Sequence, residues 1–144
     1  MGMFQIFDVA GMGMSAQSVR LNTISSNMSN ASSVSSSIDQ TYKARQPIFE
    51  TVMGNQLNEA AFDNSDYQTA GVRVAGIVES NKPLEQKYSP NHPMANEEGY
   101  IFLPNVNMVQ EMANMISASR TYQMNVQMLT TAKQMMQETI NLGR

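Results

Sequence analysis

The sequence has 144 residues, a net charge of −3 at pH 7, 14 methionines and no cysteine. Without cysteine there is no disulfide framework, zinc–thiolate site or cysteine nucleophile, and a weakly acidic chain has no overall basic field to recruit nucleic acid or anionic lipid. Charged residues make up 15% of the chain, well under the usual share of about 25%. The length suggests one domain, or one domain with an extension.

Residues 1–31 are predicted to form a first long helix, because this segment contains no proline and has a seven-residue apolar repeat. The repeat consists of Phe7, Met14, Leu21 and Met28, with Met3, Ala10, Gln17, Ile24 and Ala31 at the complementary positions. A repeat held at 3.5 residues is typical of helices that wind around a partner. Such a helix would be roughly 40 Å long.

The middle of the chain, residues 32–105, holds all five prolines and begins with a serine-rich connector. It is expected to contain a small β-rich domain, with strands near residues 46–52, 71–79 and 99–103. Gly76 interrupts the second of these segments, which indicates a bulge. Residues 53–68 are polar and acidic and are expected to be a mobile loop.

Residues 106–144 are predicted to form a second long helix, on the order of 50 Å in length. Asn105 or Asn107 is expected to cap its start, and Gly143 lies where it would stop. Its seven-residue repeat consists of Met108, Met115, Tyr122, Leu129 and Met136, completed by Met112, Ser119, Val126, Lys133 and Ile140.

Both predicted helices carry Ser, Asn, Gln and Thr opposite the apolar repeat, where a surface helix usually carries charges. Burying a hydroxyl or amide costs a few kcal/mol unless it is hydrogen-bonded, and burying an unpaired charge costs far more. A face of Ser and Asn can therefore be covered by neighbouring subunits, and flexible methionines suit varied contacts. The pattern favours helices packed within an assembly; two helices packed only on each other in one small domain are the alternative.

No motif in the sequence indicates catalysis, a cofactor or a metal site. The single histidine, His92, lies between two prolines in a stiff turn without a clustered acidic partner, which is typical of a turn residue. Glu97 and Glu98 lack a spaced set of oxygen ligands around them, and the common phosphate-binding and hydrolase motifs are missing. We therefore expect no enzyme, no small-molecule substrate and no nucleic-acid partner.

Arg20 and Arg120 are the main cations of the two nearly uncharged helices. Each is a candidate interface residue, and simple exposure to solvent is an equally good interpretation.

Several segments resemble one family of bacterial motility proteins. Residues 15–31 resemble the N-terminal signature of bacterial flagellar rod, hook and hook-associated proteins, and residues 104–107 with 111–125 resemble their C-terminal signature. Residues 71–79, and 88–93 leading to 98–100, narrow the resemblance to proximal rod proteins of the flagella basal body rod protein family. It covers nearly the whole chain, with mild departures at Ser29, Ser89, Asn91 and the serine-rich connector.

The resemblance implies a mainly α fold with a small β part. Residues 1–31 and 106–144 would form a discontinuous helical assembly domain, an inner coiled-coil layer, with residues 32–105 packed outside it. The subunit would polymerise helically into the proximal rod, a drive shaft that transmits motor torque and encloses the export channel. The implied location is the flagellar basal body, in the rod that crosses the periplasm, reached by export without a cleaved signal peptide.

The implied partners are further copies of the chain, other proximal and distal rod proteins, the ring-to-rod adaptor and the flagellar type III export apparatus. Another axial protein, such as rod protein B or the distal rod protein, and a cytoplasmic coiled-coil secretion chaperone are the alternatives. The residues expected at assembly contacts are Phe7, Met14, Arg20, Leu21, Ile24, Asn27, Met28, Asn30, Met108, Met112, Met115, Ile116, Arg120, Tyr122, Val126, Leu129, Met136 and Ile140.

Overall fold

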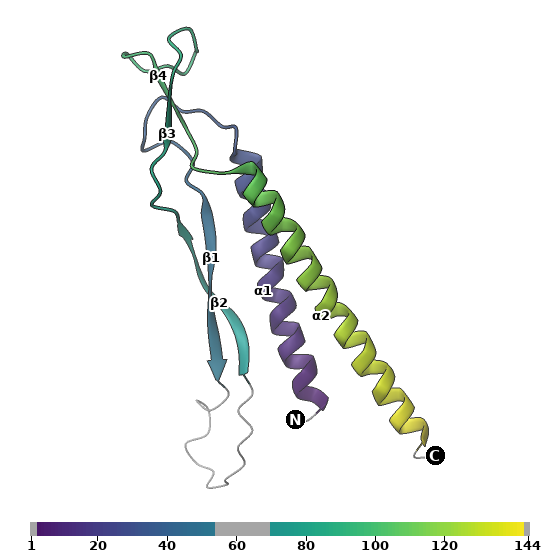
Figure 1. Cartoon of the computed structure of the whole chain (residues 1–144). Coiled ribbons are helices and arrows are strands. Elements are labelled where there is room, and N and C mark those ends of the chain that lie inside the picture. The colour runs from purple at the N-terminus through teal and green to yellow at the C-terminus, as the bar shows by residue number, and fades with distance from the viewer. Residues whose placement is uncertain (1–2, 54–69, 143–144) are drawn as a thin grey trace.

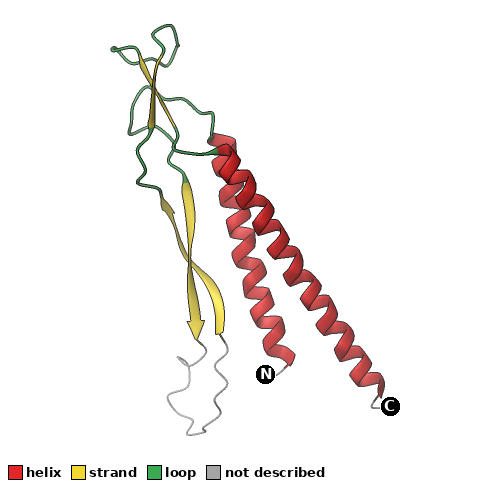
Figure 2. Ribbon diagram, viewed as in Figure 1, coloured by secondary structure: helices red, strands yellow, loops and turns green. Residues whose placement is uncertain are grey.

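The computed structural model describes residues 3–53 and 70–142, which form two long helices and two β-hairpins (Figure 2). In chain order the elements are α1 (Met3–Asn30), β1 (Arg45–Met53), β2 (Ala70–Glu79), β3 (Glu85–Tyr88), β4 (Tyr100–Leu103) and α2 (Met108–Leu142). The expected pair of terminal helices with a small strand part between them is therefore confirmed.

The two helices run antiparallel, so the start of α1 and the end of α2 lie at the same end of the molecule (Figure 1). Helix α1 packs against α2 on one side and against the β1–β2 hairpin on another. The β3–β4 hairpin lies beyond the other end of the helix pair, where α1 ends and α2 begins (Figure 1). There a backbone bridge links Ser35 of the connector to Phe102. Helix α1 is thus the central element that positions both α2 and the first hairpin.

An asparagine cap sets the start of α2. Oδ1 of Asn107 accepts hydrogen bonds from the backbone N–H groups of Val109 (3.0 Å) and Gln110 (3.1 Å), which satisfies donors that have no partner within the helix. The other candidate, Asn105, instead bonds to the strand region, as described below. Of the two asparagines that the sequence leaves open, Asn107 is the cap.

The β1–β2 hairpin is antiparallel, with Arg45 opposite Glu79 and Met53 opposite Ala70. Its register shifts between Ile48 and Phe49, where Ala75 is the extra residue on β2 beside Gly76. The expected bulge is therefore confirmed one position from the glycine. Of the predicted loop 53–68, residues 54–68 lie outside the described residues.

The β3–β4 hairpin pairs the predicted strand near residues 99–103 with a strand that the sequence analysis missed, β3. All four residues of β3 are exposed, so no apolar alternation marks it. Gly99 precedes β4 with a φ of 81°, a left-handed conformation that glycine adopts without a Cβ clash. The rings of Tyr88 and Tyr100 meet edge to face, with centroids 5.2 Å apart.

The described core is thin and made largely of small side chains. Its buried apolar residues are Ala10, Ala16, Ile24, Ala44, Ile101, Phe102, Ala118 and Ala132. Many larger apolar side chains are exposed instead, half of them on α2. No helix in the described ranges is both long and apolar enough to span a membrane.

Candidate functional site: the assembly surface

A fully hydrogen-bonded asparagine joins three parts of the chain. Asn27 of α1 is 1% exposed, and its Nδ2 donates to the carbonyl of Arg45 (2.8 Å) and to Oε2 of Glu111 (3.0 Å). Its Oδ1 accepts from the Tyr42 hydroxyl (2.9 Å) and from the backbone N–H of Arg45 (2.9 Å). Both donors and both acceptor sites of the amide are satisfied, so Asn27 ties the connector and β1 to the two helices.

Two further asparagines extend this junction. Asn114 donates from Nδ2 to Oε1 of Glu111 (3.3 Å), so both oxygens of this carboxylate have an amide partner. Asn105 accepts from the backbone N–H of Ala44 (2.7 Å) and donates to the carbonyls of Ser80 (3.3 Å) and Lys82 (2.8 Å). Hydrogen bonds of side-chain amides therefore connect the helix pair to the segments that lead into both hairpins.

The face of α2 that lies against α1 carries small and polar side chains as well as large apolar ones. Covered residues recur along it at steps of three, four or seven residues: Met108, Glu111, Met115, Ala118, Asn125, Leu129, Ala132 and Met136. A Cβ on Gly13 of α1 would lie 2.9 Å from Nδ2 of Asn125, so the Asn125 side chain packs directly against the Gly13 backbone. Four members of the repeat Met108–Met136 are half-buried, whereas Tyr122 is 37% exposed.

The second half of the α2 repeat does not face α1. Ser119 is half-buried, whereas Met112, Val126, Lys133 and Ile140 are exposed. The residues one position before Met112, Ser119, Val126 and Lys133 are instead buried or half-buried: Glu111, Ala118, Asn125 and Ala132. The larger apolar residues Met112, Val126 and Ile140 are therefore not covered by the described part of the chain.

Helix α2 consequently has an apolar surface on each side of its contact with α1. Each step along a helix turns by about 100°, so residues one position after the contact lie on one flank and those one position before it lie on the other. We call the first flank the outer stripe; it consists of Val109, Met112, Ile116, Val126 and Ile140, which are 42–74% exposed. The second flank contains Met124, Met128, Met135 and Leu142, which are 52–88% exposed.

The second flank borders a hollow of about 360 Å³. Its lining comes from α2 and from Ile6 of α1: Ile6, Met124, Gln127, Met128, Thr131, Ala132 and Met135. We call this hollow the methionine groove. Its lining carries no charged side chain, so an apolar surface of another chain can enter it without burying an unpaired charge.

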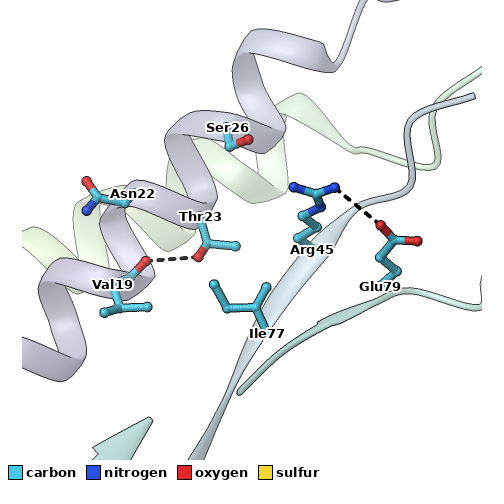
Figure 3. A pocket seen from close by; sticks show the side chains of 7 residues that line it. All are labelled: Val19, Asn22, Thr23, Ser26, Arg45, Ile77 and Glu79. Carbon is cyan, nitrogen blue, oxygen red and sulfur yellow. Dashed lines mark hydrogen bonds and ion pairs between the residues drawn. The ribbon is translucent and has the colours of Figure 1, made fainter. Parts of the chain in front are cut away.

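The exposed face of α1 is mainly polar and almost uncharged, as the sequence analysis expects. Among residues 5–30, whose side chains the structure describes, Asp8 is the one exposed charge and Val9 the one exposed large apolar residue; the other exposed positions are Ser15, Ser18, Asn22, Ser25 and Ser29. This face borders a groove of about 550 Å³ between α1 and the β1–β2 hairpin. Figure 3 shows its lining, in which Thr23 donates to the Val19 carbonyl (2.9 Å) and Arg45 pairs with Glu79 (3.4 Å).

The expected assembly residues fall into two groups in the structure. Covered or half-covered within the chain are Phe7, Met14, Arg20, Leu21, Ile24, Asn27, Met28, Asn30, Met108, Met115, Leu129 and Met136. Exposed are Met112, Ile116, Arg120, Tyr122, Val126 and Ile140. The exposed group is available to a neighbour directly, whereas Asn27 already has all its side-chain partners inside the chain.

Several exposed residues of this surface escaped the sequence analysis. Val109, Met124, Met128 and Met135 belong to neither half of the seven-residue repeat on α2. The signal that could have found them is the surplus of apolar residues on α2, which exceeds what one helix partner can cover.

Gln17, the one polar member of the α1 repeat, has its Oε1 buried with no hydrogen-bond partner among the described residues.

The remaining candidate residues have local roles. Nδ1 of His92 accepts from the backbone N–H of Met94 (3.1 Å), which fits the expected turn residue. Arg20 lines a hollow between α1, β1 and α2, and Arg120 is exposed. Within residues 3–53 and 70–142, no group of three or more His, Asp or Glu side chains is placed to hold a metal ion.

Two family models match the ends of the chain. The model described as flagella basal body rod protein matches residues 7–35, which cover most of α1 and the start of the connector. The model described as flagellar basal body rod FlgEFG protein C-terminal matches residues 97–142, which cover β4 and α2.

Curated relatives match along the full length. The chain is 44% identical to the flagellar basal-body rod protein FlgC of Escherichia coli O6:H1 and 42% identical to that of Salmonella typhimurium, each over 144 residues and 100% of both chains. It is 37% identical to FlgC of Borreliella burgdorferi over 149 aligned positions, which cover 97% of each chain.

Proposed function

Because the chain belongs to the family of flagellar basal-body rod proteins and is a structural component of the proximal rod, we propose that its two helices form the inner, coiled-coil layer of that rod. Residues 1–31 and 106–144 would then act as one discontinuous assembly domain, with residues 32–105 outside it. The outer stripe and the methionine groove of α2 are the surfaces through which copies and other rod proteins pack.

The single observation that carries this proposal is the pair of apolar flanks on α2. Ile116 is 55% exposed and Val109 is 74% exposed on one side, and Met124 is 60% exposed on the other. Burying apolar surface stabilises an association by roughly 25 cal/mol per Å², whereas one helix partner covers only one face. A helix with two open apolar flanks suits a position between neighbours on both sides.

The contacts between the helices support a coiled-coil layer. Asn27 bonds to Glu111, and Gly13 approaches Asn125. The two α1 residues lie fourteen positions apart, and so do the two α2 residues, which is two seven-residue repeats on each helix. A register kept at multiples of seven is the pattern that supercoiled helices require.

The uncharged face of α1 supports a crowded inner layer. Ser18, Asn22 and Ser25 are exposed there, and such side chains can be covered by another backbone or amide at a small cost once hydrogen-bonded. The implied neighbours are other copies, proximal and distal rod proteins and the ring-to-rod adaptor. Export by the flagellar type III apparatus without a cleaved signal, and assembly across the periplasm, belong to the same proposal.

A charge placed on the outer stripe tests the proposal. Ile116→Asp changes an exposed side chain, so circular dichroism of the isolated protein should be unchanged, while the carboxylate opposes burial against a neighbour. Cells that carry this variant as their one copy should yield no complete basal bodies and should not swim. The matched control is Gln134→Asp, which puts the same charge on an exposed polar position of α2 and should allow swimming. Normal swimming by the Ile116→Asp strain would contradict the assignment of this surface.

A further inference from the structure

The methionine groove gathers three exposed thioether groups on one short stretch of helix. Met124, Met128 and Met135 are 60%, 52% and 58% exposed, and all three line the same hollow beside Ile6 of α1. Their spacing of four and seven residues places them along one side of α2. Met115 and Met136, in contrast, lie against α1 and are half-buried.

We propose that Met124, Met128 and Met135 form an oxidation-sensitive site, whose conversion to methionine sulfoxide blocks incorporation of the free subunit. The oxidant is a hypohalous acid. In the net reaction the thioether sulfur gains one oxygen and loses two electrons, the oxygen–halogen bond breaks and the halogen is reduced to halide, and the proton of the acid is released. Susceptibility follows exposure, and the product is reversible by methionine sulfoxide reductases.

The physical consequence follows from the character of the groove. Sulfoxide formation turns a flexible apolar side chain into a polar one, and the described lining offers few polar partners, chiefly Gln127 and Thr131. A neighbour that covers the groove would have to desolvate up to three sulfoxide oxygens, which is unfavourable without matching donors. The sensitivity exists only before assembly, because the neighbour that buries the groove also shields its sulfur atoms; this part rests on the proposed function.

The first measurement uses the isolated full-length protein and limiting hypochlorite, followed by peptide mass spectrometry. Met124, Met128 and Met135 should be oxidised at least about threefold faster than Met115 and Met136, in line with their exposure. Equal rates at all five positions would overturn the site. This readout does not depend on assembly, so it stands apart from the proposed function.

The second measurement follows assembly in cells in which the subunit is the one induced rod protein, with sublethal hypochlorite present during induction. The triple variant Met124→Leu, Met128→Leu, Met135→Leu should give at least about three times as many basal bodies as the unaltered chain. The matched control is Met94→Leu: Met94 is 44% exposed but lies between β3 and β4, so its removal should give no protection.

Equal basal-body counts for the triple variant and the unaltered chain would refute the effect on incorporation. Met128→Asp without oxidant separates this failure from that of the proposed function. If that variant assembles normally, the groove is not an assembly surface; if it fails while the triple variant gives no protection, the groove is an assembly surface and the oxidation effect is refuted.

Discussion

Replacing Asn27 by aspartate is the sharpest test of the junction between the helices and the hairpins. Aspartate has the same shape and keeps the two hydrogen bonds accepted from Tyr42 and from the Arg45 N–H. It loses the two bonds donated by Nδ2, and it places an oxygen against Oε2 of Glu111, now 3.0 Å from Nδ2, and against the Arg45 carbonyl.

The expected loss of stability is large for a one-atom change. A buried acceptor left without its donor costs about 1–3 kcal/mol, more when it is charged, and two neighbouring carboxylates repel each other at a site where Asn27 is 1% exposed. We therefore expect Asn27→Asp to lower the free energy of unfolding by about 3–5 kcal/mol, a substantial part of the 5–15 kcal/mol typical of a domain.

A second change is designed to restore the contact. When Asn27→Asp is combined with Glu111→Gln, the amide introduced by the second substitution can donate to the new carboxylate, so the pair is hydrogen-bonded again with the donor and acceptor exchanged. The double variant should be about 2 kcal/mol more stable than Asn27→Asp, and the Glu111→Gln single variant completes the double-mutant cycle that gives the coupling energy. Urea unfolding of the isolated protein, followed by circular dichroism, gives each value.

Asn22→Asp is the matched control, because it is the same substitution on the same helix at an exposed position. It should change stability by no more than about 0.5 kcal/mol. If Asn27→Asp behaves like this control, or if Glu111→Gln brings no recovery, the hydrogen-bonded junction does not hold the segments together and the reasoning is refuted.

Further predictions concern glycines and one buried amide. Gly11→Ala should stabilise the isolated protein by about 0.5–1 kcal/mol, since a Cβ there meets no atom within 4 Å; Gly13→Ala should gain less or lose, since its Cβ would lie 2.9 Å from Nδ2 of Asn125, and urea unfolding ranks the two. Gly99→Ala forces a φ of 81° on alanine and should weaken the β3–β4 hairpin by about 1–2 kcal/mol, seen as a loss of tyrosine near-ultraviolet dichroism; an unchanged spectrum would contradict the strain. Gln17→Met should raise the thermal midpoint by a few degrees, because it removes a buried oxygen that has no hydrogen-bond partner within residues 3–53 and 70–142; a lower midpoint would show that this oxygen is satisfied.

Seven-residue periodicity and proline placement were enough to predict both helices. The structure begins α1 at Met3 and ends it at Asn30, and α2 runs from Met108 to Leu142, within a few residues of the expected bounds. Proline-free segments with a regular apolar repeat permit little else. The strands β1, β2 and β4 follow from β-branched composition, while the exposed β3 has no such signal.

The face that α2 turns toward α1 could not be predicted from hydropathy. The covered positions include the small residues Ala118 and Ala132 and the polar Asn125, whose side-chain amide lies against Gly13 of α1. Larger residues such as Val126, one position further on, are exposed and suited to a partner outside the chain. Likewise, the partners of Asn27 lie on segments far apart in the sequence, so periodicity gave no hint that its amide would be a junction rather than a surface contact.

The antiparallel arrangement of the helices has a practical consequence for genetic labelling. Since α1 starts and α2 ends at the same end of the molecule (Figure 1), a fluorescent protein fused to either terminus would lie at that end, beside the methionine groove. The connection between Tyr88 and Tyr100, at the tip farthest from that end, is the better insertion point for an epitope or dye, and a label there reports on the subunit while leaving both helices untouched.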